Sequence, residues 1–323
     1  MTTYKGIKGL SIQTIAGDPS NLASGDIWYN SSSRKIRGTR LVAAWSSAPA
    51  LNAGRQGKAG GGTQTAAWVA GGSDDPQNYQ ATELYDGSSW TEVGNPNETH
   101  PQTAGGGVQT AGWMATGGGV SGEHFDGSTW THAEDCNQGN AQRASCGPQT
   151  AAMMFGSEPV TTATESYDGT NWTEVADYPQ AFKGGEAVGT NTAAVVFGGY
   201  ATVNSGATYF WANEAYTWDG SSFTAIPNLN TASSELGKSG ASSTAAMKIG
   251  GIVPPNNQIA NVEIWNGTSW TEVADIPAAT NQGDGAGTST ATIFTFGKIA
   301  NGTYPTTTVE WNEGQTASSF TSS

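Results

Sequence analysis

Short apolar runs that end in glycine recur along most of the chain. Each run starts with Thr-Ala, continues with mostly apolar residues and then reaches glycine, as in residues 65–72 (TAAWVAGG). The runs begin, at spacings of 40 to 52 residues, at Thr65, Thr110, Thr150, Thr192, Thr244 and Thr290. Apolar runs of this length, bounded by glycine, predict buried strands. None approaches the roughly 18 residues that a membrane-spanning helix needs.

A second motif alternates with the first. It consists of Asp or Asn, then Gly, two small polar residues and an aromatic, and it follows directly on a large aromatic residue. Its defining residues are Asp86, Gly87 and Trp90; Asp126, Gly127 and Trp130; Asp168, Gly169 and Trp172; Asp219, Gly220 and Phe223; and Asn266, Gly267 and Trp270. Asp-Gly and Asn-Gly favour tight hairpin turns in which both central residues adopt φ > 0. We therefore expect each copy to join two outer strands of a sheet.

The two motifs together define a repeat of about 45 residues. Such a period is typical of a β-propeller, in which each unit is one four-stranded blade. We expect the Thr-Ala runs to be the inner strands, where only small side chains fit, and the large aromatics to lie further out. Trp311 to Phe320 resembles a sixth copy with a longer turn.

The way in which the ring of blades closes leaves two possible numbers of blades. Residues 41–52 (LVAAWSSAPALN) resemble the outer strand and loop at residues 268–280. A propeller can remove its free edge by pairing an N-terminal strand with the last blade. The chain then forms either six blades, which we favour, or a seven-fold ring with one incomplete blade.

Apolar residues followed by Gly-Gly, and later by Tyr-Asp and Trp, resemble the kelch-type β-propeller repeat. The resemblance covers about residues 53–323 and implies an all-β kelch-like propeller. Some copies depart from the pattern, because Ser157 and Lys298 stand where a second Gly is expected, and Phe223 and Phe320 replace Trp. The resemblance implies a fold and not an activity, since propellers host enzymes and binding scaffolds alike.

Charge is unevenly divided along the 323 residues, whose net charge is −14. The first 60 residues carry eight basic and two acidic side chains, which gives +6, so the rest carries −20. An acidic body repels a phosphate backbone, so we expect no nucleic-acid partner. The asymmetry predicts either an N-terminal arm with its own partner or a basic leader that packs on its own acidic body.

Residues 25–32 (GDIWYNSS) are similar to a segment near the start of tail and fibre proteins of tailed, especially marine, bacteriophages that also carry kelch-like repeats. The resemblance implies a virion protein with an extended docking arm and closing strand at 1–50 and a propeller at 51–323. The expected docking residues are Lys5, Lys8, Trp28, Tyr29, Arg34, Lys35 and Arg37. The resemblance to tail and fibre proteins further implies that the protein assembles in the host cytoplasm and is exposed on the particle in multiple copies. Its expected partners are other virion proteins, and no membrane insertion is expected.

The task expected of this protein is adsorption to the host surface through a glycan or a protein. Decoration of the capsid or tail without receptor binding is one alternative. The other is a carbohydrate-binding or protein-adaptor propeller of a bacterium.

An insertion at residues 200–216 is the candidate binding site. Recognition usually resides in loops that a rigid scaffold presents. Tyr200, Tyr209, Phe210 and Trp211 are suited to stacking on a sugar. Alternatively, these aromatics lengthen a strand and pack between blades.

No catalytic residue, cofactor or metal is expected. A sialidase needs a clamp of three Arg, but the propeller region holds only Arg55 and Arg143. The copper site of galactose oxidase needs ligands from several blades, and the three His of this chain lie close together in sequence. Two of them, His124 and His132, flank one turn, where positions on neighbouring strands can share a face and bind a metal, but we expect a structural or exposed pair instead. Cys136 and Cys146 form either a small disulfide or two free thiols.

Overall fold

The computed structural model describes residues 12–21, 26–117, 119–203 and 208–319. Strands, and no helix, make up the regular structure of these residues, so no described helix is long and apolar enough to cross a membrane. The chain divides into two compact units, a larger one at Trp45–Trp311 and a smaller one that combines Met1–Ala44 with Asn312–Ser323. Two long strands, β3 (Lys35–Ala48) and β33 (Thr308–Ser319), contribute residues to both units.

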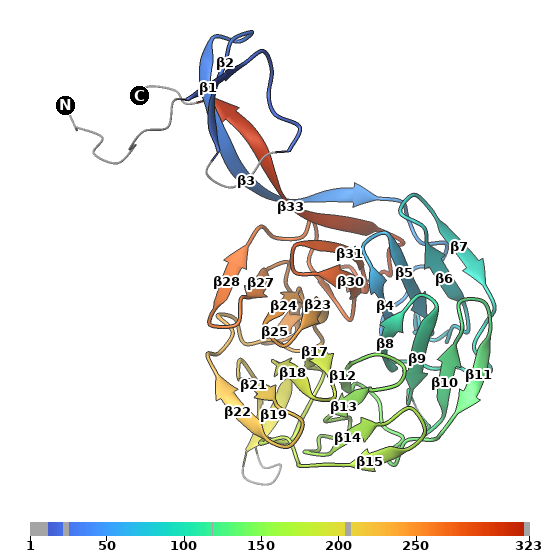
Figure 1. Cartoon of the computed structure of the whole chain (residues 1–323). Helices are drawn as coiled ribbons and strands as arrows, with labels where there is room; N and C mark the ends of the chain where they lie inside the picture. Colours follow the sequence, from blue (N-terminus) through green and yellow to red (C-terminus); the bar gives the residue numbers. More distant parts are fainter. Residues whose placement is uncertain (1–11, 22–25, 118, 204–207, 320–323) are drawn as a thin grey trace. The chain divides into compact units, whose positions relative to one another are not determined.

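The larger unit is built from four-stranded antiparallel sheets, each formed by consecutive parts of the chain (Figure 1). The first sheet contains β4 (Ala59–Thr63), β5 (Ala66–Ala70), β6 (Thr82–Tyr85) and β7 (Trp90–Val93). The second and third contain β8 (Ala104–Val108), β9 (Ala111–Ala115), β10 (Gly122–Phe125) and β11 (Trp130–Ala133), then β12 (Ala144–Cys146), β13 (Met153–Phe155), β14 (Thr164–Tyr167) and β15 (Trp172–Glu174). The fourth and fifth contain β17 (Glu186–Thr190), β18 (Ala193–Phe197), β21 (Ala215–Trp218) and β22 (Phe223–Ile226), then β23 (Gly237–Ser242), β24 (Ala245–Ile249), β27 (Val262–Trp265) and β28 (Trp270–Val273).

A further sheet uses both ends of the larger unit. Its strand order within the larger unit is β30 (Asp284–Thr288), β31 (Ala291–Thr295), β33 and β3. The sheet has six described strands in all, because β2 (Ile27–Asn30) and β1 (Gln13–Ile15) of the smaller unit follow β3. The resemblance of residues 41–52 to an outer strand is confirmed as far as Ala48, where β3 ends. The predicted turn after Trp311 is wrong, because β33 continues as a strand through Asn312 and Gly314. Phe320, its proposed outer aromatic, lies outside the described residues.

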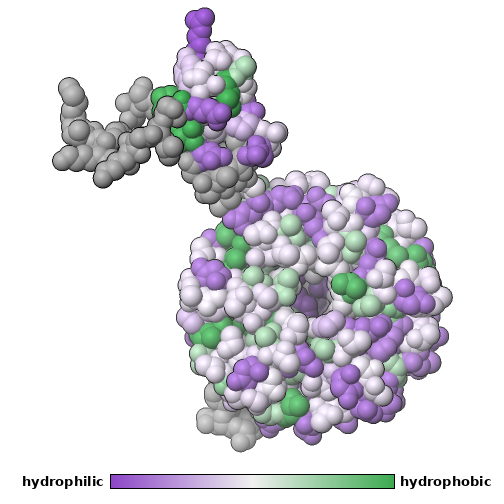
Figure 2. All heavy atoms as spheres, in the orientation of Figure 1, coloured by the Kyte–Doolittle hydropathy of each residue, from purple (hydrophilic) through white to green (hydrophobic). Residues whose placement is uncertain are grey.

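The innermost strands of these sheets contact one another in cyclic order. β4 contacts β8, and the series continues through β12, β17, β23 and β30 back to β4. This is a β-propeller-like arrangement, and the surface of the larger unit is hollowed at the centre of its sheets (Figure 2).

The expectation that the Thr-Ala runs are innermost is wrong by one strand. They form second strands such as β5, while the innermost strands are glycine-rich, as in β4 (AGGGT). A Cβ on Gly61 would lie 2.4 Å from the carbonyl oxygen of Gly107 in the neighbouring sheet. Innermost backbones therefore approach too closely for even a methyl group at this position.

The core lies between sheets and is rich in aromatic pairs. The aromatic before each turn and the aromatic after it are opposite one another on neighbouring strands, as in Tyr85 and Trp90, whose ring centroids are 5.0 Å apart. The corresponding pairs are Phe125–Trp130, Tyr167–Trp172, Trp218–Phe223 and Trp265–Trp270. Trp45 and Trp311 are 5.3 Å apart, so β3 supplies the aromatic that the last copy of the repeat lacks. Placement of the large aromatics in the outer strands is thus confirmed.

The Asp-Gly motifs mark hairpins, as predicted, but the turn conformation differs. Tyr85 pairs with Trp90, so the loop has four residues rather than two. Gly87 has φ 89°, whereas Asp86 is not among the residues with positive φ. The Asp86 carboxylate instead accepts hydrogen bonds from the backbone N–H groups of Ser88 and Ser89. Asp is therefore selected here as a side-chain acceptor and not for φ > 0.

A recurrent contact, the Asn–Glu latch, joins each of several sheets to the loop before it. Asn52 donates from its backbone N–H and its side-chain amide to Glu83 Oε2, at 2.7 and 2.8 Å. The other latches are Asn97–Glu123, Asn137–Glu165 and Asn230–Glu263. All four carboxylates are buried. A basic side chain accompanies three of them, in the pairs Arg55–Glu83, His100–Glu123 and Arg143–Glu165.

The smaller unit is not the bare extended arm that we expected. Within it, β1 (Gln13–Ile15) pairs in parallel with β2 (Ile27–Asn30), which forms an antiparallel hairpin with β3. Trp28 is buried and donates through Nε1 to Asp18, which also forms an ion pair of 2.8 Å with Arg37. The described part of this unit therefore has a small core of its own.

Candidate functional site

The insertion after Gly199 forms a hairpin outside the fourth four-stranded sheet. β19 (Tyr200–Val203) pairs with β20 (Thr208–Trp211), and the short strand β16 (Phe182–Lys183) pairs with β19. Tyr200 is opposite Trp211, and Ala201 is opposite Phe210. Since successive side chains in a strand point to opposite faces, Phe210 lies on the other face of the hairpin from Tyr200, Tyr209 and Trp211.

The two faces have different roles. Phe210 packs against the apolar core between the third and fourth sheets, which is the structural alternative considered above. Tyr209 is 50% exposed, and its ring stacks on Tyr200 at 5.4 Å with an interplanar angle of 12°. Trp211 meets Tyr200 edge-on at 5.0 Å. We call Tyr200, Tyr209 and Trp211 the aromatic cluster.

Charged groups lie directly beside the aromatic cluster. Lys183 Nζ is 5.8 Å from the centre of the Tyr200 ring, within range of a cation–π contact. The same ammonium pairs with the Glu158 carboxylate. The cluster is therefore bordered by one positive and one negative group.

Two hollows adjoin the cluster, each of about 280 Å³. The outer hollow is lined by Glu158, Pro159, Val160 and Tyr209, together with Lys183 and Tyr200. The inner hollow shares Lys183 and Tyr200 with it. Its remaining lining residues are Gln142, Gly184, Trp211, Ser234, Glu235, Ile252 and Asn256. The linings of the two hollows thus combine aromatic rings with amide, carboxylate and hydroxyl groups.

A ring of equivalent residues surrounds one end of the central channel, which the innermost strands enclose. This end is the one nearer the aromatic cluster. Gly57, Gln102, Gln142, Gly184, Glu235 and Gln282 precede the innermost strands, and all have φ between 51° and 60°. Hydrogen bonds link their backbones around the ring, for example from the Gln142 N–H to the Gln102 carbonyl and from the Gly184 N–H to the Gln142 carbonyl. The Gly57 N–H donates to the Gln282 carbonyl, and the Gly57 carbonyl accepts from the N–H of Thr103, the residue after Gln102. We call this ring the axial mouth.

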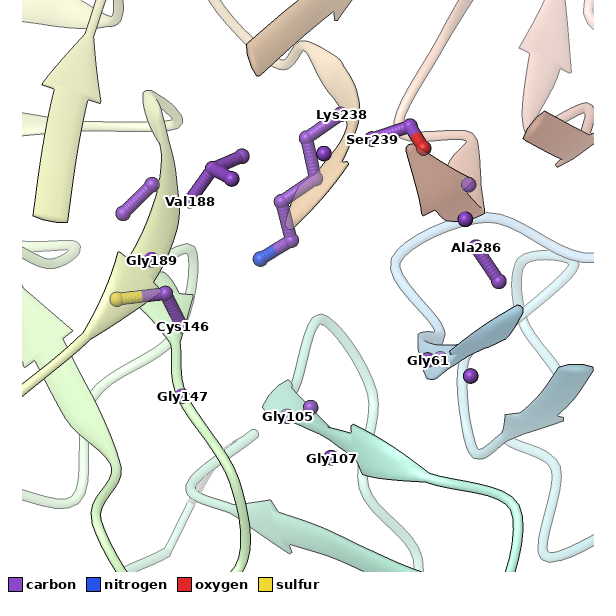
Figure 3. Close-up of a pocket in the computed structure, with 17 residues that line it drawn as sticks. Gly61, Gly105, Gly107, Cys146, Gly147, Val188, Gly189, Lys238, Ser239 and Ala286 are labelled. Carbon is purple, nitrogen blue, oxygen red and sulfur yellow. The ribbon is translucent and has the colours of Figure 1, made fainter. Parts of the chain in front are cut away.

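The far end of the channel holds a pocket of about 100 Å³ lined mainly by glycine (Figure 3). Lys238 extends into it, and its Nζ lies 3.0 Å from Glu186 Oε2 and also donates to the Ser145 carbonyl. Burial opposes the charged form of Lys238 most strongly, but the carboxylates of Glu186 and Asp284 outweigh it and raise its pKa. Burial raises the pKa of the Cys146 thiol to about 12. Neither group is deprotonated at neutral pH, so this pocket offers no activated nucleophile.

His124 and His132 do not share a face. His132 is opposite Glu123, and His124 is opposite Thr131, so the two rings project from opposite faces of the hairpin. His124 packs edge-on against Tyr167, and His132 is exposed. Among the described residues no group of three His, Cys, Asp or Glu side chains is placed to hold a metal.

The two cysteines and the two arginines of the larger unit are all buried. Cys136 and Cys146 are both buried free thiols, so the disulfide alternative is wrong. Arg55 and Arg143 are buried against Glu83 and Glu165, and neither guanidinium is free to bind an anionic substrate.

The predicted docking residues fall into three groups. Lys5 and Lys8 lie outside the described residues. Arg34 and Lys35 are exposed at the β2–β3 turn, where Arg34 has φ 54°. Tyr29 and Arg37 are half-buried, and Arg37 is paired with Asp18. Trp28, which also contacts Asp18, is buried in the core of the smaller unit rather than on its surface.

No protein-family model and no curated protein matches this sequence. The site is therefore interpreted from its own geometry. Sequence reasoning located the aromatic cluster but missed Lys183, Glu158, Gln142, Glu235 and Asn256, which are up to 114 positions apart in the chain and come together only in the folded arrangement of the sheets.

Proposed function

We propose that this protein is a non-enzymatic virion protein of a tailed bacteriophage, in which a six-bladed kelch-type propeller binds a glycan on the host surface. The observation that carries the binding role is the aromatic cluster with its two polar hollows. The C–H face of a sugar ring packs on an aromatic face, while its hydroxyl groups take the place of water at amide and carboxylate groups.

The negative charge of the protein favours neutral over anionic glycans as ligands. The chain carries a net charge of −14, and Lys183, which adjoins the cluster, is already paired with Glu158. A field of this sign disfavours the approach of anionic ligands. The ligand best supported is a neutral saccharide.

Six blades and a kelch-type repeat are supported by the cyclic contacts of the innermost strands and by the repeated Gly-Gly and Tyr-Asp…Trp pattern. Virion attachment through residues 1–50 is supported by the similarity of residues 25–32 to phage tail and fibre proteins. The exposed Arg34 and Lys35 agree with a docking role. Mass spectrometry and cryo-electron microscopy of purified particles test this part, and particles that lack the protein would contradict it.

The binding role is tested by Tyr209→Ala. This change removes the most exposed ring of the cluster, and we expect affinity for host cells or for array glycans to fall about tenfold, which corresponds to roughly 1.4 kcal/mol. Binding is measured on a glycan array and by host-cell pull-down.

A matched control is Tyr304→Ala. Tyr304 has Lys298 Nζ 5.8 Å from its ring centre, so it repeats the Lys–Tyr arrangement away from both hollows. We expect the control to bind like the unmodified protein. Equal binding by all three proteins would refute the glycan site, and a protein that binds no cell or glycan would favour decoration.

A further inference from the structure

The inner hollow and the axial mouth are parts of one surface. Gln142, Gly184 and Glu235 line both. A ligand that lies against Tyr200 and Trp211 in the inner hollow therefore lies next to residues of the axial mouth.

Four of the six positions of the axial mouth carry polar side chains, although their left-handed backbone conformation is the one that glycine adopts most readily. Gly57 and Gly184 occupy two of the six equivalent positions, with the same φ of 60°. Gln102, Gln142, Glu235 and Gln282 adopt this left-handed conformation with a Cβ, which costs about 1 kcal/mol or more for each residue. Strained positions of this kind concentrate at ligand sites, where the side chain is needed.

The position of the Glu235 carboxylate is fixed by its neighbours. Its Oε2 accepts hydrogen bonds from Asn281 Nδ2 at 2.5 Å and from Gln282 Nε2 at 2.9 Å. Two donors hold one oxygen, so the side chain is oriented before any ligand arrives. Glu235 thus presents a preorganised carboxylate to the inner hollow, and Gln142 lines the same hollow, where its buried Oε1 has no hydrogen-bond partner among the described residues.

We propose that the ligand is an oligosaccharide of at least two units, which stacks on the aromatic cluster at its outer end and forms hydrogen bonds with Gln142 and Glu235 at its inner end. This inference rests on the proposed glycan-binding function and adds the second subsite. The mouth itself holds only about 60 Å³, much less than either hollow. That is too small for a further sugar ring, so the chain of sugars ends before the mouth.

The test measures how affinity depends on length. Malto-, cello- and chito-oligosaccharides of one to six units are titrated against the full-length protein by calorimetry. For the series that binds, we expect affinity to rise at least tenfold between one and three units and then to level off. Tyr209→Ala weakens every length.

Two glycine substitutions at equivalent positions separate the subsite from the fold. Gln142→Gly removes a side chain that lines both the mouth and the inner hollow, whereas Gln102→Gly removes one that lines the mouth alone. Both should fold, because glycine stands at Gly57 and Gly184, and thermal unfolding checks this. We expect Gln142→Gly to abolish the gain with length and leave binding of the single sugar unchanged, and Gln102→Gly to change affinity less than twofold.

The outcomes distinguish the two proposals. Affinity that is independent of length, yet lost in Tyr209→Ala, overturns the second subsite and leaves the glycan site standing. Equal losses in Gln142→Gly and Gln102→Gly also overturn it. If no series binds the unmodified protein, both proposals fail.

Discussion

Buried carboxylates show how single residues fix the packing of neighbouring sheets. Glu83 is 1% exposed, and an ionised carboxylate at such a depth is costly unless its oxygens are paired and hydrogen-bonded. The Asn–Glu latch supplies those bonds from the preceding loop, and Arg55 adds a positive charge at 3.2 Å. Each latch therefore couples the orientation of a loop to that of the next sheet.

His100 makes one of these contacts sensitive to pH. Burial, the largest effect, opposes its charged form, but hydrogen bonds to Glu123 and to the Thr116 carbonyl, with the Glu123 charge, outweigh it and raise the His100 pKa. A raised pKa in the folded state means that the stabilisation is complete below the unfolded value near 6.5 and is lost as pH rises through the folded value.

We therefore expect the free energy of unfolding to decline between pH 6 and 9 relative to that of His100→Arg. Arg is the natural residue in the equivalent Arg55 and Arg143 contacts, and it stays charged over this range. Urea unfolding at each pH gives both curves. A constant difference between them would show that His100 does not change its charge in this range.

The hairpin turns illustrate which residue-scale properties a sequence reveals. Asp-Gly and Asn-Gly located their five hairpin turns correctly because Gly at φ > 0 is a strong local requirement. The role of Asp86 was missed, because its four hydrogen bonds to Ser88 and Ser89 depend on loop length, which the dipeptide alone leaves open. These bonds lower the pKa of Asp86 to about 2.

At the level of strands, glycine in the innermost position is the strictest requirement. We expect Gly61→Ala to lower the free energy of unfolding by about 1 to 3 kcal/mol, because its Cβ would meet the Gly107 carbonyl oxygen, a backbone atom that cannot rotate away. Gly119→Ala is the control, since no heavy atom lies within 4 Å of its Cβ, and we expect a change within about 0.5 kcal/mol. Denaturant unfolding measures both, and equal effects would contradict the close approach of innermost strands.

The order of strands within a sheet was predicted less well than their existence. Both β4 and β5 are made largely of small residues, so size alone does not say which is nearer the axis. Trp68 in β5 decides it, because a fully buried indole needs the space between sheets that an innermost strand lacks. The binding hairpin was predicted from its length and aromatic content, whereas its polar lining comes from other sheets and left no local pattern.

At the level of the whole molecule, the last sheet of the ring is completed from the N-terminal side. The sequence indicates that residues near Trp45 form an outer strand. Asn52 stands seven residues after Trp45, and Asn97 stands seven residues after the outer-strand aromatic Trp90. Where Pro replaces this Asn, at Pro179 and Pro277, the next sheets carry no latch Glu but Tyr216 and Val309. Proline has no N–H to donate, so a buried Glu there would lose one of its hydrogen bonds.

Closure predicts that two fragments of the larger unit differ sharply in stability. Fragment 45–311 retains Trp45, which packs on Trp311, the buried Leu51 and the Asn52 latch. Fragment 53–311 loses all three, and a buried Leu alone contributes about 2 to 5 kcal/mol, so the combined loss is comparable with the 5 to 15 kcal/mol that stabilise a typical domain. We expect the first fragment to unfold cooperatively in urea with native near-ultraviolet circular dichroism, and the second to have neither property. Equal stability of the two fragments would mean that the β3 segment is an accessory strand and that the remaining sheets hold the ring together without it.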